Sequence, residues 1–233
     1  MQVAGKLIDK ALEEVRLRPD QTSQVESMKA EAEKRHAPVK AAENRLAMAV
    51  ADQIERGELD RCALAPDIQA FGAAVADART DDRADFEKLH TLLDPTQRAA
   101  FAAALERQWD SIQKMHEPSA LADKMARDLT LSDDQKTSLE KILTGLREVR
   151  EAEPSYAAHR ERRAKILDNF KGDRSVFDGL APEKDVAAHT AAKVEQRIWA
   201  GEAILPVLNQ DQRKAVADKI RAWAKGTSSS EEE

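Results

Sequence analysis

The sequence has few of the residues that form disulfides, tight turns and aromatic cores. Cys62 is the only cysteine among 233 residues, so it cannot form an internal disulfide and has no second cysteine for a metal knuckle. Eight glycines, eight prolines and 4% aromatic residues provide little of the chemistry of turns and strands. These shortages argue against a strand-rich fold.

Long apolar runs and an excess of basic residues are also missing. No stretch of about 18 apolar residues occurs, so we expect no membrane span. The 37 Lys and Arg against 43 Asp and Glu give a net charge of −6, which argues against general nucleic-acid binding. No apolar leader segment follows Met1. We therefore expect either a cytosolic chain or a mature exported chain whose leader has been removed.

Motifs of nucleotide binding and hydrolysis are absent as well. The sequence contains no G-x-x-x-x-G-K-[ST], G-x-G-x-x-G, G-x-S-x-G or H-E-x-x-H. The five histidines are scattered, without an i, i+4 pair that could begin a metal site. We expect no enzymatic activity, no cofactor and no resident metal.

Alanine and charged residues dominate what is present. Hydrophobic residues make up 42% of the chain, but 41 of them are alanines, so larger apolar side chains are scarce. Together with abundant Glu, Lys, Arg, Leu and Gln, this composition predicts an all-α protein with a thin core.

The chain contains an internal repeat. The stretch from Leu7 to Gln21 aligns without gaps on the stretch 114 residues later, and the motif at Leu93 recurs 115 residues later. Four L-x-x-x-Q motifs thus form two pairs with nearly equal separations of 76 and 77 residues. We predict a first repeat over 1–116, a second over 117–225 and a disordered tail over 226–233.

Each motif predicts the start of a helix. A capping residue follows the leucine, and a glutamine three residues after the cap can reach back to the N–H of the cap. Arg18 is the exception, because it stands at the cap position and cannot accept a hydrogen bond as Asp or Ser does. The residues to which we give this structural role are Leu17, Gln21, Leu93, Asp94, Gln97, Leu131, Ser132, Gln135, Leu208, Asn209 and Gln212.

Prolines, glycines and apolar spacing divide each repeat into five helices. Breaks are predicted at His36-Ala37-Pro38 and Ala65-Pro66 in the first repeat, and Pro206 is expected to bend or end a helix in the second. The predicted helices cover residues 4–16, 19–35, 38–56, 66–92, 95–115, 119–129, 133–151, 155–171, 182–207 and 210–225.

Paired motifs of this kind, about 75 residues apart in an alanine- and charge-rich helical unit, resemble the LTxxQ motif of Spy/CpxP-like periplasmic proteins. Leu131-Ser132-Asp133-Asp134-Gln135 is nearest to the typical form. The resemblance implies helical hairpins, export to the periplasm and ATP-independent binding of unfolded or partly folded clients. Two tandem units imply a monomer that builds a pseudo-two-fold, elongated or cradle-shaped bundle, as relatives do with two subunits.

Client binding of this kind needs long charged side chains to attract clients, and methionines and small apolar patches to hold them. The alternative is that these residues form solvated helix faces with intrahelical ion pairs. The candidate client-binding residues are Met28, Lys29, Arg35, Arg45, Met48, Arg147, Arg150, Arg160, Arg162 and Arg163.

Two further functions remain open. The protein could be a stress-signalling or metal-responsive accessory that binds the periplasmic domain of a membrane sensor, or it could be a purely structural helical scaffold. Suppression of the aggregation of unrelated clients favours a chaperone, whereas saturable binding of one partner, or of Zn²⁺ or Cu²⁺, favours the accessory.

Overall fold

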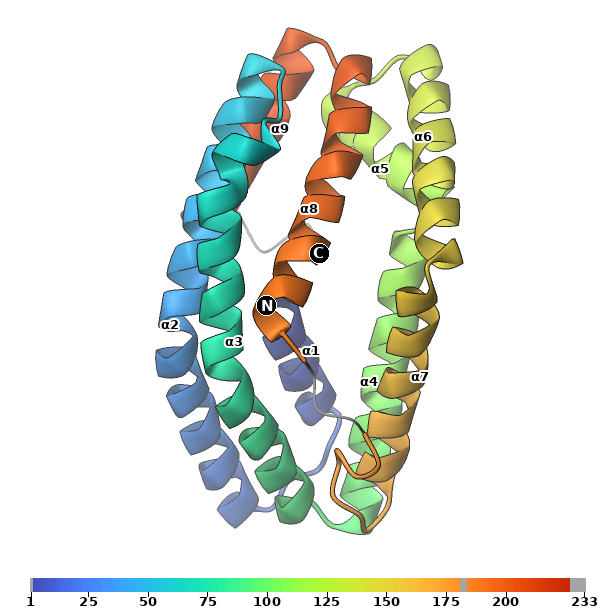
Figure 1. Cartoon of the computed structure of the whole chain (residues 1–233). Coiled ribbons are helices and arrows are strands. Elements are labelled where there is room, and N and C mark those ends of the chain that lie inside the picture. Colours follow the sequence, from blue (N-terminus) through green and yellow to red (C-terminus); the bar gives the residue numbers. More distant parts are fainter. Residues whose placement is uncertain (1, 181–183, 227–233) are drawn as a thin grey trace. The chain divides into compact units, whose positions relative to one another are not determined.

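The structure is a computed structural model that describes residues 2–180 and 184–226 (Figure 1). Helices make up nearly all of the described part and no strand occurs in it, which confirms the all-α prediction. No helix in the described ranges is long and apolar enough to cross a membrane. The helices are α1 (Gln2–Glu13), α2 (Pro19–Arg56), α3 (Arg61–Leu92), α4 (Pro95–Met115), α5 (Pro118–Leu129), α6 (Asp133–Ala152), α7 (Pro154–Lys171), α8 (Val186–Ile204), the short 3₁₀ helix η1 (Leu205–Val207) and α9 (Gln210–Ala224).

The chain divides into two compact units, and each is assembled from three separated segments. The first unit comprises residues 1–36, 79–117 and 148–183, and the second comprises 37–78, 118–147 and 184–233. Each unit therefore draws on both predicted repeats, and neither unit coincides with a repeat. Residues 227–233 of the predicted tail lie outside the described residues.

The core of the first unit is built on an aromatic group. Phe101 and Phe170 are fully buried, with ring centroids 4.9 Å apart, and the ring of Phe86 lies 5.0 Å from that of Phe170. Tilted rings at this separation add about 0.5–1.5 kcal/mol beyond the burial of their area. The core therefore joins α3, α4 and α7, and aliphatic residues of α1 complete it.

A loop after α7 closes this core. Val176 is fully buried, and the carboxylate of Glu87 on α3 accepts hydrogen bonds from the Ser175 hydroxyl at 2.5 Å and from the N–H of Val176 at 3.0 Å. The N–H of Phe177 donates to the same carboxylate at 3.3 Å. Burial opposes the ionisation of Glu87, but these donors outweigh it and lower its pKa.

In the second unit, Ala51 and Ile54 of α2 pack against Leu205 and Ala217 in an aliphatic cluster. The backbones of two helices also approach each other closely in this unit. A Cβ placed on Gly72 of α3 would lie 2.7 Å from the carbonyl oxygen of Ala187 on α8. Only glycine fits at this contact without a shift of the backbone.

The predicted break at residues 36–38 is wrong, because α2 runs through Pro38 without interruption. The proline removes one N–H, but ion pairs hold the preceding turn of α2 on α3. Arg35 binds Asp82 at 3.0 Å and Asp85 at 2.6 Å, and His36 Nε2 lies 2.7 Å from Asp82. Tertiary contacts here outweigh the local cost of the proline.

The predicted start of the helix over residues 66–92 is also wrong. Helix α3 begins at Arg61 rather than near Pro66, because Asp60 provides the cap: its Oδ1 accepts from the N–H of Cys62 at 2.8 Å and of Ala63 at 3.2 Å. Pro66 lies inside the helix near its start, so it removes only one hydrogen bond. Pro206 ends the regular α-helix as predicted, since α8 gives way to η1 at Leu205.

Candidate functional site

The glutamines of the first two motifs form a reciprocal pair, which we call the first glutamine pair. Gln21 Nε2 donates to Gln97 Oε1 at 2.8 Å, and Gln97 Nε2 donates to Gln21 Oε1 at 2.9 Å. The second amide proton of each goes to a backbone carbonyl, that of Leu92 at 2.7 Å and that of Arg16 at 2.8 Å. The pair thus connects the first turns of α2 and α4, and its outer bonds reach the segment before α2 and the end of α3.

The second glutamine pair repeats this arrangement in the other compact unit. Gln135 Nε2 donates to Gln212 Oε1 at 2.8 Å, and Gln212 Nε2 donates to Gln135 Oε1 at 3.1 Å. Gln135 Nε2 also donates to the carbonyl of Val207 at 2.7 Å, which is the repeat counterpart of the bond to Leu92. The two halves of the sequence therefore build the same contact.

The predicted caps are present at three of the four motifs. Asp94 and Asn209 each form a complete capping box with the glutamine three residues later. Ser132 does the same, since its N–H donates to Gln135 Oε1 at 3.0 Å and its hydroxyl accepts from the N–H of Gln135 at 3.3 Å. Arg18 supplies only the N–H half, which donates to Gln21 Oε1 at 2.9 Å.

The motif leucines support these helix starts to different extents. Leu93 and Leu208 are buried, whereas Leu17 and Leu131 are half-buried. Two of the four therefore lie in a core, in the first and second unit respectively. The caps and glutamines of the motifs thus make their contacts at helix starts.

The candidate client-binding cations of α2 already have partners within the protein. Lys29 binds Asp9 at 3.0 Å; burial opposes its charge, but the ion pair outweighs it and raises its pKa. Arg35 makes the two ion pairs to α3 described above, and Arg45 lies 3.5 Å from Asp67. These side chains therefore stabilise the hairpin of α2 with its neighbours.

The methionines of α2 and the cation near the end of α6 are also partly enclosed. Met28 packs against the core of the first unit, and both Met48 and Arg147 are half-buried. Arg150 is exposed, with its guanidinium 5.2 Å from the ring centre of Tyr156. The two candidate methionines are therefore both partly enclosed in the folded protein.

The cations of α7 lie in a different setting. Arg160 is exposed, whereas Arg162 and Arg163 are half-buried, so these cations do not form the uniformly solvated helix face of the alternative interpretation. The guanidinium of Arg163 lies 4.7 Å above the ring of Trp109 on α4, a cation–π contact. Arg160 and Arg163 line a groove between α4 and α7, two helices that pack against each other in the first unit.

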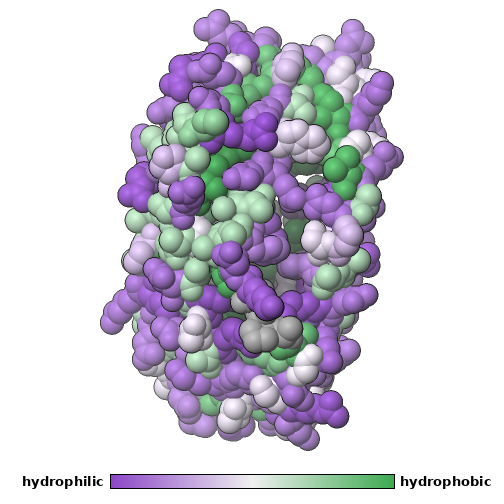
Figure 2. Space-filling view, in the orientation of Figure 1, coloured by the Kyte–Doolittle hydropathy of each residue, from purple (hydrophilic) through white to green (hydrophobic). Residues whose placement is uncertain are grey.

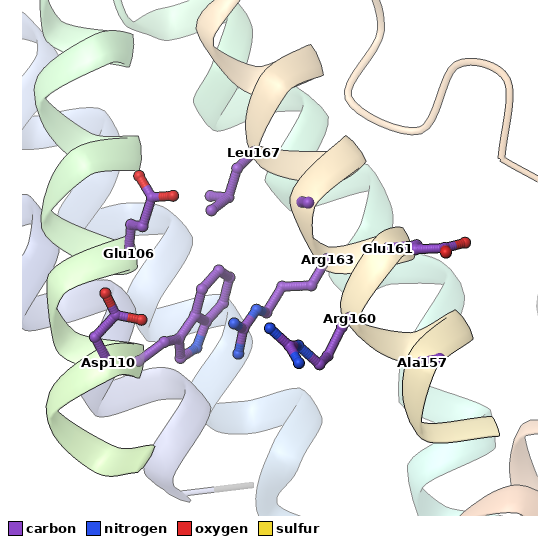
Figure 3. A pocket seen from close by; sticks show the side chains of 9 residues that line it. Glu106, Asp110, Ala157, Arg160, Glu161, Arg163 and Leu167 are labelled. Atoms are coloured by element: carbon purple, nitrogen blue, oxygen red, sulfur yellow. The ribbon is translucent and has the colours of Figure 1, made fainter. Parts of the chain in front are cut away.

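Figure 3 shows this groove, which has a volume of about 400 Å³. Arg160 and Arg163 reach from α7 toward α4, which presents Glu106 and Asp110, while Glu161 points away. We call this feature the α4/α7 groove; its lining comprises Glu106, Trp109, Asp110, Ala157, Arg160, Glu161, Arg163, Ala164 and Leu167. The sequence did not single out Trp109 as a site residue, because nothing in the spacing indicates which helix faces α7.

The rest of the surface is mostly hydrophilic on the face shown in Figure 2, with hydrophobic residues in small groups. Among the residues whose burial is described, the large exposed hydrophobic ones are Met115 and Val149 in the first unit and Trp199 and Trp223 in the second. Within residues 2–180 and 184–226, no three His, Cys, Asp or Glu side chains converge as a metal site would need.

Comparisons with known proteins found no match: no family model, no curated protein and no solved structure matches this chain.

Proposed function

We propose that the protein is an ATP-independent chaperone that binds unfolded or partly folded proteins and suppresses their aggregation. The observation that carries the proposal is the recurrence of the reciprocal glutamine pair. The motifs that resemble those of the Spy/CpxP-like family form such a pair in each repeat, and the paired glutamines of the two repeats are 114 and 115 residues apart. The recurrence supports the proposal because both motif pairs of this chain have the same structural role.

The composition of the surface supports this function. A chaperone without a nucleotide motor needs weak contacts that adapt to many sequences and can be released. The α4/α7 groove combines an indole, guanidinium groups and small apolar side chains, and the exposed Met115 lies at the end of the same α4 helix. This combination suits short, varied segments better than a single rigid ligand.

The proposal includes the compartment and the assembly state that the resemblance implies. The protein would act in the periplasm during envelope stress, as a monomer whose two repeats take the place of two subunits. Cell fractionation of the product of the full-length gene tests the compartment, and light scattering coupled to size exclusion tests the assembly state.

The decisive experiment follows aggregation of chemically denatured clients by light scattering, without nucleotide. Several unrelated clients should be protected at about equimolar chaperone, and ATP should change nothing. Saturable binding to one partner, without protection of the others, would instead favour the sensor-binding accessory. Circular dichroism run in parallel ensures that the protein is folded in each assay.

A further inference from the structure

The α4/α7 groove is open because the helix that forms one wall carries alanines where it faces Trp109. Ala157 and Ala164 are seven residues apart, which is about two helical turns and puts both on one side of α7. Their side chains are too short to fill the space beside the indole. The resulting volume of about 400 Å³ falls within the range of ligand pockets, about 300–1,000 Å³.

The charges that line the groove do not cancel. On α4, the carboxylate of Glu106 forms an ion pair with Lys171, whose Nζ lies 3.8 Å away. Asp110, the other carboxylate of this wall, has no ion pair among the described residues. On α7, Arg163 lies on the indole, and Arg160 has no carboxylate partner in the described part of the chain. Glu161 also belongs to the lining but points away from α4 (Figure 3), so two guanidinium groups and one carboxylate without an ion pair remain directed into the groove.

We propose that this groove binds extended client segments in which an acidic residue stands next to an aromatic or aliphatic one. This inference rests on the chaperone function proposed above and names the class of client segment. The apolar side chain packs against Leu167 and the two alanines, and the client carboxylate pairs with Arg160. Arg163 remains on Trp109, where it adds positive charge without blocking the space beside the alanines.

The test uses short fluorescent peptides as probes, with binding followed by anisotropy. One peptide places Phe next to Glu in a glycine- and serine-rich context, a second has Gln for that Glu, and a third has Ala for the Phe. We expect the first peptide to bind at least tenfold more tightly than the third. It should also bind more tightly than the second, by a margin that shrinks as salt is raised, because the contact to Arg160 is charge-assisted and exposed.

A matched pair of variants locates the site. Ala164→Leu fills the groove, whereas Ala158→Leu adds the same side chain to an exposed position of α7 outside the groove lining. The first change should weaken binding of the Phe-Glu peptide at least tenfold, and the second should change it less than twofold. Arg160→Gln should remove the preference for Glu over Gln and leave the preference for Phe over Ala.

The outcomes separate this inference from the chaperone proposal. If the wild type prevents client aggregation but folded Ala164→Leu binds the peptide as the wild type does, the groove assignment is overturned and the chaperone function stands. If Ala164→Leu fails to fold by circular dichroism, the exposed Arg160→Gln decides, because an unchanged Glu preference overturns the assignment. If the wild type gives no protection, the chaperone function fails, whereas Glu-dependent binding of the peptide still supports the groove.

Discussion

The first glutamine pair offers the sharpest test of how the motifs stabilise the fold. Gln21 is fully buried, and both hydrogen-bonding atoms of its amide are used twice: Oε1 accepts from Arg18 and Gln97, and Nε2 donates to Leu92 and Gln97. Gln21→Met keeps the length of the side chain and removes these four bonds. At about 1 kcal/mol for each bond, the expected loss of unfolding free energy is about 4 kcal/mol.

A double-mutant cycle separates the pair from its surroundings. Gln97 also makes four bonds, two of which are the bonds it shares with Gln21. Gln21→Met and Gln97→Met each remove both shared bonds, so the double variant should be more stable than additivity predicts by about 2 kcal/mol. Urea unfolding followed by circular dichroism gives the three free energies.

The second repeat provides the comparison. Gln135 makes equivalent bonds but is half-buried, so water can replace part of what Gln135→Met removes, and we expect a loss of about 2 kcal/mol. A loss below about 1 kcal/mol for Gln21→Met, or strict additivity in the double variant, would refute the reasoning. Either result would mean that the amides contribute little in the folded state beyond what water offers them.

Three further predictions concern single positions. Asp94→Ala should lower the free energy of unfolding by about 1 kcal/mol because it removes the side-chain cap of α4, whereas Arg18→Ala should cost much less; equal thermal shifts would contradict this. Gly72→Ala should destabilise the protein by about 1–3 kcal/mol because its Cβ would collide with the backbone of α8. Gly145→Ala lies in mid-helix and meets no atom within 4 Å, so it should stabilise the protein by about 0.5–1 kcal/mol. The denaturation midpoints of the two variants should therefore shift in opposite directions. The folded-state pKa of Glu87 lies below its ordinary value of 4.5, so its contribution to stability is complete above that value and disappears as the pH falls through the lower, folded-state pKa. Glu87→Gln should therefore reduce the loss of stability on acidification in this range, and an unchanged acid limb of the stability profile would count against the role of its carboxylate.

Helix content and capping could be predicted from the sequence because both are local properties. Alanine, charge and the spacing of apolar residues favour helix wherever they occur, and a cap acts within one turn. The wrong predictions concern helix boundaries that are determined by contacts between residues distant in the sequence. Pro38 favours a break locally, but Arg35 and His36 attach the adjoining turn to Asp82 on another helix, and no local pattern announces that pairing.

The candidate site was predictable only in part for the same reason. The basic cluster on α7 stands out in the sequence, but the partner of Arg163 is Trp109, 54 positions earlier on another helix. The pairing of Gln21 with Gln97 was likewise out of reach, although the repeat placed both at helix starts. A glutamine that uses Oε1 in a capping box still has an amide N–H₂ group that needs acceptors. In the first pair this group is buried, so an acceptor elsewhere in the protein had to be expected.

The affinity for an unfolded protein compared with its native form tests the central claim most directly. A permanently unfolded client, such as a reduced and alkylated disulfide protein, is titrated with the chain in a calorimeter beside the same protein in its native state, without nucleotide. The account predicts micromolar, reversible binding of the unfolded form and no measurable binding of the native form. Equal affinity for both forms, or none for either, would contradict it.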